Sequence, residues 1–201
     1  MKNKKNLDVV FLLDRSGSMA GSETDTIGGY NSYLNKQRKN NNNPKITTIL
    51  FDDKYELLYD RKDIKEVKNL TEKEYYVRGC TALLDAIGIT ITNLSKKVGN
   101  NKVLFVITTD GLENASKEYN KTKIKELIES HKNWEFIYIG ANIDSYSEGT
   151  EIGISIKNIS NYKKSKKGTE SLFRSIEKAT NILYEEETLD ASWKESLENN
   201  Q

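Results

Sequence analysis

The sequence predicts an α/β protein with a doubly wound, mostly parallel sheet of six strands, one of them an antiparallel edge strand, and with helices on both faces. Two observations lead to this prediction. Short apolar runs alternate along the chain with segments of helical periodicity, as in a sheet covered by helices. The first apolar run, residues 7–13, contains five consecutive apolar residues, which is typical of a parallel strand buried on both faces.

The first half of the chain starts with the strand at 7–13 and a helix at 24–39, which carries Tyr30, Tyr33 and Leu34 along one side. A polar breaker at 40–44 separates this helix from a second strand at 45–51. Residues 52–54 are few enough to form a hairpin turn, so residues 55–59 are expected to return antiparallel at the sheet edge. Residues 60–80 are expected to be irregular.

The second half repeats the alternation of helix and strand. Apolar residues at helical spacing predict a helix over 82–98, and the apolar runs at 102–108 and 134–140 predict two more strands. Similar periodicity predicts helices at 117–132 and 169–185, and a short sixth strand is expected near 154–159. We expect one domain over 1–185 and an acidic C-terminal tail over 186–201, which Trp193 and Leu197 would be able to dock.

Composition excludes several classes of protein. Lys and Arg total 31 against 30 Asp and Glu, so there is no electrostatic case for nucleic-acid binding. The longest clean apolar run is far shorter than the roughly 20 residues that span a membrane, and the basic start lacks the features of a signal peptide. The single Cys80 suits a reducing compartment. We therefore expect a cytoplasmic protein.

Oxygen-bearing side chains gather at predicted strand ends and at one helix entry. Asp14, Ser16 and Ser18 follow the first strand, Asp110 follows the strand at 102–108, and Thr81 opens the helix at 82–98. Ligands in open α/β sheets bind at the carboxyl ends of the strands. Hydroxyls and carboxylates without His or Cys suit a hard cation such as Mg²⁺ or Mn²⁺.

Asp14-x-Ser16-x-Ser18, Thr81 and Asp110-Gly111 together resemble the metal-ion-dependent adhesion site of von Willebrand factor type A domains, over roughly residues 6–185. With topology rules, the resemblance implies the strand order 3-2-1-4-5, which makes the strands ending in Asp14 and Asp110 neighbours. It also implies that Ser16, Ser18 and Thr81 bind the ion directly. Asp14 and Asp110 would act mainly through bound water or by orienting the hydroxyls.

Three functions remain open. The first is a non-enzymatic binding module whose cation captures an Asp or Glu carboxylate of a partner protein. The second is a metal-dependent hydrolase such as a phosphatase, although Ser16 stands where such enzymes usually carry a second Asp. The third is a scaffold subunit of a larger assembly; the chain has no P-loop, so any ATPase in that assembly would be a separate chain.

Other residues with reactive or charged groups are expected to be structural. His131 falls near a predicted helix C-terminus, where a cation suits the helix dipole. Cys80 has no candidate base nearby and is expected to be a small loop residue. The basic run at 163–167, which includes Lys164, is expected to be a solvated loop. Tyr75 and Tyr76 are equally compatible with core packing and with contact to a partner.

Overall fold

The computed structural model describes residues 6–40 and 43–199 and has the α/β architecture that the sequence predicts. One sheet has the order β3-β2-β1-β4-β5-β6, in which β3 is antiparallel to β2 and the other neighbours are parallel. The predicted order and the antiparallel edge strand are confirmed. The strands are β1 (Leu7–Asp14), β2 (Lys45–Phe51), β3 (Tyr55–Asp63), β4 (Lys102–Thr109), β5 (Trp134–Gly140) and β6 (Ile159–Asn161).

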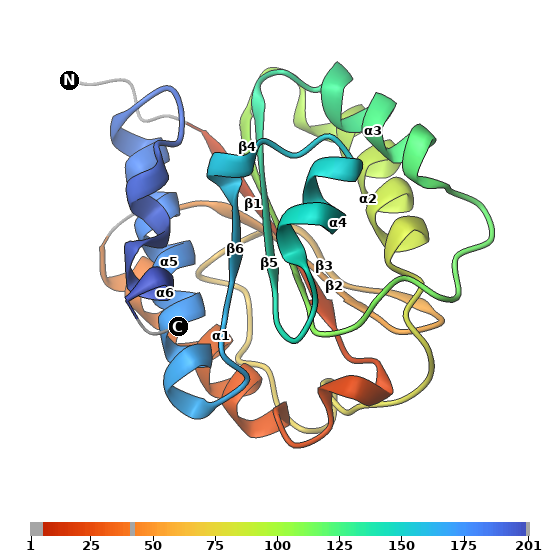
Figure 1. The fold of residues 1–201 in the computed structure, drawn as a ribbon. Helices are drawn as coiled ribbons and strands as arrows, with labels where there is room; N and C mark the ends of the chain where they lie inside the picture. The colour runs from red at the N-terminus through yellow and green to blue at the C-terminus, as the bar shows by residue number, and fades with distance from the viewer. Residues whose placement is uncertain (1–5, 41–42, 200–201) are drawn as a thin grey trace.

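Helices cover both faces of the sheet (Figure 1). One face carries α1 (Glu23–Lys39), α5 (Lys166–Glu185) and α6 (Glu195–Glu198), and the other carries α2 (Leu83–Val98), α3 (Lys121–Ser130) and α4 (Ser145–Glu151). Since successive side chains of a strand point to opposite faces, β1 contributes to both cores. Val9 and Phe11 pack with α1 and α5, whereas Val10 and Leu12 pack with α2 and α3.

Aromatic residues of α1 join that helix to the sheet. The ring of Phe11 meets Tyr30 and Tyr33 edge to face, with centroids 5.2 and 5.0 Å apart. The Tyr30 hydroxyl lies 2.7 Å from Thr48 Oγ1, and the Tyr33 hydroxyl lies 3.0 Å from Thr180 Oγ1. Each buried hydroxyl therefore keeps a hydrogen-bond partner, which avoids the cost of an unsatisfied polar group.

Some boundaries differ from the predicted ones. β3 continues to Asp63 through an irregular register, where Arg61 has a φ of 47° and its guanidinium pairs with the buried Asp8 at 2.6 Å. The helix expected at 117–132 begins at Lys121 instead. The Asp85 carboxylate accepts the backbone N–H groups of residues 117, 118 and 119, and it thereby holds that segment as a loop.

The region after β5 also departs from the prediction. α4 was not predicted, because its sequence Ser-Tyr-Ser-Glu-Gly-Thr-Glu has no apolar stripe. The sixth strand starts at Ile159 rather than near 154, since a 3-10 turn (Ile156–Asn158) precedes it. Segments this short contain too few residues to show the apolar spacing of a helix or a strand.

The segment after α5 packs against the domain. A 3-10 turn (Ala191–Lys194) and α6 place Trp193 and Leu197 in the core cluster beside α5, and Trp193 Nε1 donates to the Lys157 carbonyl at 3.1 Å. Residues 1–5, 41–42 and 200–201 lie outside the described residues, and with them the basic start and part of the predicted breaker. No helix in the described ranges is long and apolar enough to cross a membrane.

Candidate metal centre

The structure brings the five predicted site residues together at the carboxyl ends of β1 and β4. These strands are neighbours, with Leu13 opposite Thr108, so Asp14 and Asp110 reach the same edge of the sheet. Ser18 Oγ donates to Asp110 Oδ1 at 2.6 Å, and Ser16 Oγ lies 3.1 Å from Ser18 Oγ. Residues that are far apart in the sequence therefore share one cluster of oxygen atoms.

Thr81 completes the cluster from the loop before α2. A Cβ built on Gly111 would lie 3.1 Å from Ser18 Oγ, 3.2 Å from Thr81 Oγ1 and 3.9 Å from Ser16 Oγ. Three hydroxyls thus face the small space beside Gly111, which stays open because this residue has no side chain. A site bounded by hydroxyl oxygens with two nearby carboxylates fits a hard divalent cation.

Asp14 lies behind the hydroxyls and orients the loop that carries them. Its Oδ1 accepts from the Ser16 backbone N–H at 2.7 Å, and its Oδ2 accepts from Thr109 Oγ1 at 2.6 Å. Burial raises the pKa of the Asp14 carboxyl above its usual range, more than these hydrogen bonds lower it, and the nearby Asp110 raises it further. A cation at this site would offset the unfavourable negative charge.

Two residues that sequence reasoning missed hold the Thr81 loop. The Thr81 N–H donates to Asn114 Oδ1 at 2.9 Å, and the Asn114 N–H donates back to the Thr81 carbonyl at 3.0 Å. Glu113 accepts the Leu84 N–H at 2.9 Å and so caps the first turn of α2. Both residues follow Asp110-Gly111 closely, and this proximity is the one sequence signal for their role.

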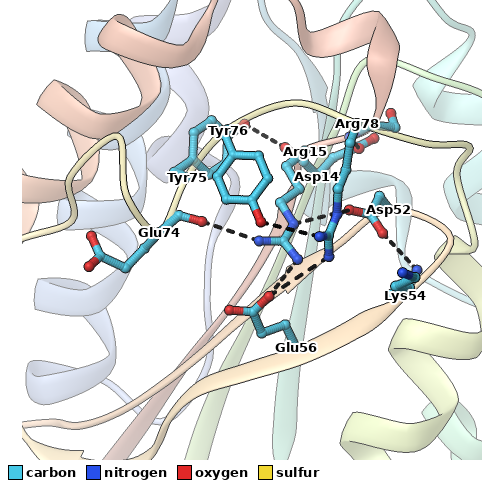
Figure 2. A network of polar contacts seen from close by, with 10 residues as sticks. Asp14, Arg15, Asp52, Lys54, Glu56, Glu74, Tyr75, Tyr76 and Arg78 are labelled. Atoms are coloured by element: carbon cyan, nitrogen blue, oxygen red, sulfur yellow. Dashed lines mark hydrogen bonds and ion pairs between the residues drawn. The ribbon is translucent and has the colours of Figure 1, made fainter.

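An ionic network around the buried pair of Arg15 and Asp52 connects the loops of the site (Figure 2). Asp52 Oδ2 lies 3.1 Å from Arg15 Nε and 2.6 Å from Arg78 Nε, and Glu56 Oε2 lies 2.6 Å from Arg15 Nη2. The Arg78 N–H also donates to the Arg15 carbonyl at 2.9 Å. Arg15 stands between Asp14 and Ser16, and Arg78 precedes the Thr81 loop, so the network ties two parts of the site together.

The two tyrosines before the Thr81 loop have different surroundings. Tyr75 is buried, and its hydroxyl donates to the Asp14 carbonyl at 2.5 Å. Tyr76 is 44 % exposed, and its ring centroid lies 5.4 Å from the guanidinium carbon of both Arg15 and Arg78. Tyr75 is thus a core residue that supports the site, whereas Tyr76 remains accessible beside it.

Lys164 contradicts the expectation of a solvated loop. Its side chain is only 22 % exposed, and its Nζ lies 2.8 Å from Asp110 Oδ2. The same ammonium donates to the carbonyl of Ser18. The sequence shows a run of similar lysines, and only the folded chain distinguishes the one that reaches a site carboxylate.

His131 lies outside the oxygen cluster, and Cys80 lies at its margin. His131 is the C-cap of α3, where Nδ1 lies 2.7 Å from the Leu127 carbonyl and the ring packs on Trp134. Cys80 is an exposed free thiol next to Thr81. Among the residues that the structure describes, no three His, Cys, Asp or Glu side chains gather as a metal site would need. Any cation at the candidate centre therefore depends on hydroxyl oxygens.

Comparison with known proteins supports the fold. No family model matches the sequence, and no curated protein matches it. Proximal thread matrix protein 1 from the mussel byssus, in a structure with a zinc-occupied MIDAS motif, is 16 % identical with a TM-score of 0.61, and the match covers 88 % of this chain and 46 % of that one. A von Willebrand factor type A protein from Catenulispora acidiphila is 12 % identical with a TM-score of 0.62, covering 88 % and 43 %.

A third structure, of a variant of the minor pilin PilB from Streptococcus sanguinis, is 12 % identical with a TM-score of 0.65 and covers 92 % of this chain and 63 % of that one. The chain therefore spans between two fifths and two thirds of the length of the structures it matches. These likenesses show that it has the fold of von Willebrand factor type A domains.

Proposed function

We propose that this chain is a metal-dependent protein-binding module. Asp14, Ser16, Ser18, Thr81 and Asp110 would hold one divalent cation, and the cation would capture an Asp or Glu carboxylate of a partner protein. The observation that carries this proposal is the convergence of three hydroxyls on the space beside Gly111, with two carboxylates next to them.

The donor atoms favour Mg²⁺ or Mn²⁺. The mussel protein with the same fold has a zinc-occupied MIDAS motif, which supports a divalent cation at this position. Zinc in proteins prefers Cys, His and carboxylate ligands, whereas three of the five proposed ligands here are neutral hydroxyls. Hydroxyl and carboxylate oxygens at a compact site suit the harder ions.

The neutral hydroxyls also support the choice of partner. A cation held mainly by uncharged oxygens keeps most of its charge, so it attracts a carboxylate at an open position.

The chain's net charge of +1 gives no basis for binding nucleic acid, and we propose no membrane partner. The exposed free thiol of Cys80 supports a reducing compartment such as the cytoplasm.

We propose binding rather than catalysis because the groups that a hydrolase would need are already engaged. Both oxygens of the buried Asp14 carboxylate accept hydrogen bonds from the chain itself, which favours a role in orienting the loop over attack on a substrate. The Arg15 guanidinium is completely buried and paired with Asp52 and Glu56, so it is not free to bind a phosphate. A phosphatase assay with Mg²⁺ should therefore show no turnover; turnover that disappears with Asp14→Asn would favour the hydrolase.

The central test separates ion binding from partner binding. Calorimetry with MgCl₂ and MnCl₂ should show one bound ion for the wild type and strongly weakened binding for Thr81→Ala. Thr150→Ala, on the exposed surface of α4, is the matched control and should bind as the wild type does.

Affinity capture from the native cell should then recover a partner with Mg²⁺ and lose it with chelator or Thr81→Ala. A partner that is retained under both conditions would show that another face binds it, as in the scaffold hypothesis.

A further inference from the structure

The ammonium of Lys164 occupies a position at the candidate metal centre. Lys164 belongs to the loop between β6 and α5, and its Nζ lies 2.8 Å from Oδ2 of Asp110, whose side chain is 1 % exposed. It also donates to the Ser18 carbonyl. Both contacts are with residues proposed to hold the cation. A positive charge from the chain itself thus already neutralises one of the two site carboxylates.

The loop that carries Lys164 is fixed at both ends. The Tyr162 N–H donates to the Gly140 carbonyl at 2.8 Å, which continues the sheet beyond β6. Ser165 caps α5 by accepting the Gly168 N–H at 3.2 Å. Gly168 itself packs so tightly that a Cβ there would lie 1.9 Å from the Lys163 carbonyl oxygen. Lys164 therefore extends from a well-supported backbone toward the site.

Charge balance suggests what this lysine does. Asp14 and Asp110 are both buried and repel each other. Among the described residues, Lys164 forms the ion pair of Asp110, and no ion pair of Asp14 is found. A divalent cation beside Asp110 and an ammonium 2.8 Å from the same carboxylate would repel each other, because both would lie next to one buried side chain.

We propose that Lys164 is a built-in competitor of the cation. It neutralises Asp110 in the metal-free protein and must leave that carboxylate when the ion binds. This inference rests on the proposed metal site. The lysine lowers the apparent affinity for the ion, since only molecules with the ammonium released are competent to bind it. Ion binding is thereby coupled to the loop between β6 and α5.

The test compares three variants with the wild type by calorimetric titration of MgCl₂ and MnCl₂. Lys164→Met keeps the length of the side chain and removes its charge. If the ammonium is docked in about nine molecules of ten, this variant should bind the ion about tenfold more tightly. Lys164→Arg keeps the charge and should retain weak binding. Lys163→Met, at an exposed neighbouring position, is the matched control and should bind as the wild type does.

A second measurement does not depend on ion affinity. In chelator, Lys164→Met should unfold at a lower denaturant concentration than the wild type, because Asp110 loses its counter-ion. Saturating Mg²⁺ should remove or reverse this difference. Lys163→Met should not differ from the wild type in either condition.

The outcomes distinguish this inference from the proposed function. Equal or weaker ion binding by Lys164→Met, with the wild type binding normally, would overturn the competitor role and leave the metal site intact. If neither the wild type nor Lys164→Met binds an ion, both proposals fail. If Lys164→Met binds an ion and the wild type does not, the result would support the inference in its strongest form, in which the lysine prevents ion binding entirely.

Discussion

Arg15 and Asp52 form an ion pair in which both side chains have 0 % exposure, with 3.1 Å between Arg15 Nε and Asp52 Oδ2. Arg78 shares the same carboxylate oxygen at 2.6 Å. The loop carrying Ser16 and Ser18 and the loop carrying Thr81 are thus joined through one carboxylate, which is not among the proposed ligands. The integrity of the candidate centre therefore depends on residues outside the proposed ligand set.

Replacing Asp52 with Asn should destabilise the protein by about 3 kcal/mol, because it leaves the buried Arg15 with a single acidic partner. Denaturant unfolding followed by circular dichroism measures this. Asp60→Asn, which breaks the exposed pair with Lys97, is the control and should cost less than about 1 kcal/mol. Similar losses in both variants would show that burial adds nothing to the Asp52 interactions.

Replacing Gly111 with Ala should abolish ion binding and leave the fold intact. The new methyl group would stand 3.1 Å from Ser18 Oγ and 3.2 Å from Thr81 Oγ1, in the space that the hydroxyls face. Gly111 is not among the glycines with positive φ, so its backbone accepts alanine. Calorimetry with Mn²⁺ and an unfolding curve provide the two readouts.

Gly28→Ala is the matched control for this experiment, because it adds a methyl group on α1 with no atom within 4 Å. It should bind Mn²⁺ as the wild type does and gain about 0.5 to 1 kcal/mol of stability from the better helix former. Undiminished Mn²⁺ binding by Gly111→Ala would place the ion elsewhere.

Replacing Asp14 with Asn should stabilise the metal-free protein at neutral pH and remove its response to metal. Burial raises the pKa of the Asp14 carboxyl, so the ionised form is unfavourable in the native state. Asparagine keeps an oxygen for the Ser16 N–H without that charge. An ion at 100 times its Kd should stabilise the wild type by about 2.7 kcal/mol, and the variant should gain nothing. Thermal unfolding in chelator and in Mg²⁺ compares the two; a variant less stable in chelator would contradict this account.

The protein should lose stability above about pH 10, the ordinary pKa of tyrosine. Burial raises the pKa of Tyr30, Tyr33, Tyr138 and Tyr162. Below pH 10 these hydroxyls are neutral in both states, so stability is unaffected. Above it the unfolded chain releases protons that the native state retains, and each group then favours unfolding by up to about 1.4 kcal/mol per pH unit.

Urea unfolding at pH 9, 10 and 11 measures this loss. Tyr33→Phe should make the decline of stability with pH less steep, whatever its effect at pH 9. A decline as steep in Tyr33→Phe as in the wild type would mean that the buried Tyr33 does not contribute to it.

Short-range patterns in the sequence determined the architecture. The apolar run that ends in Asp14 predicted β1, and helical spacing of Ile87, Ile91 and Leu94 predicted α2. These predictions were right because the burial of a helix or strand imposes a characteristic spacing on its own apolar residues, independently of the other elements. The five site residues were also recognisable from the sequence, since each follows a strand or opens a helix, and the structure brings them together; that they bind a cation stays a prediction.

The tertiary structure alone decided which charges meet. Nothing near Arg15 in the sequence points to Asp52, and nothing distinguishes Lys164 from Lys163, although one contacts Asp110 and the other is exposed. Such contacts join residues from different elements, and their distances depend on how the strands and loops pack. Local periodicity carries no information about them, because a pair of charges has no period along the chain. The sequence therefore specified the residues of the candidate centre, and packing specified which charged side chains lie next to them.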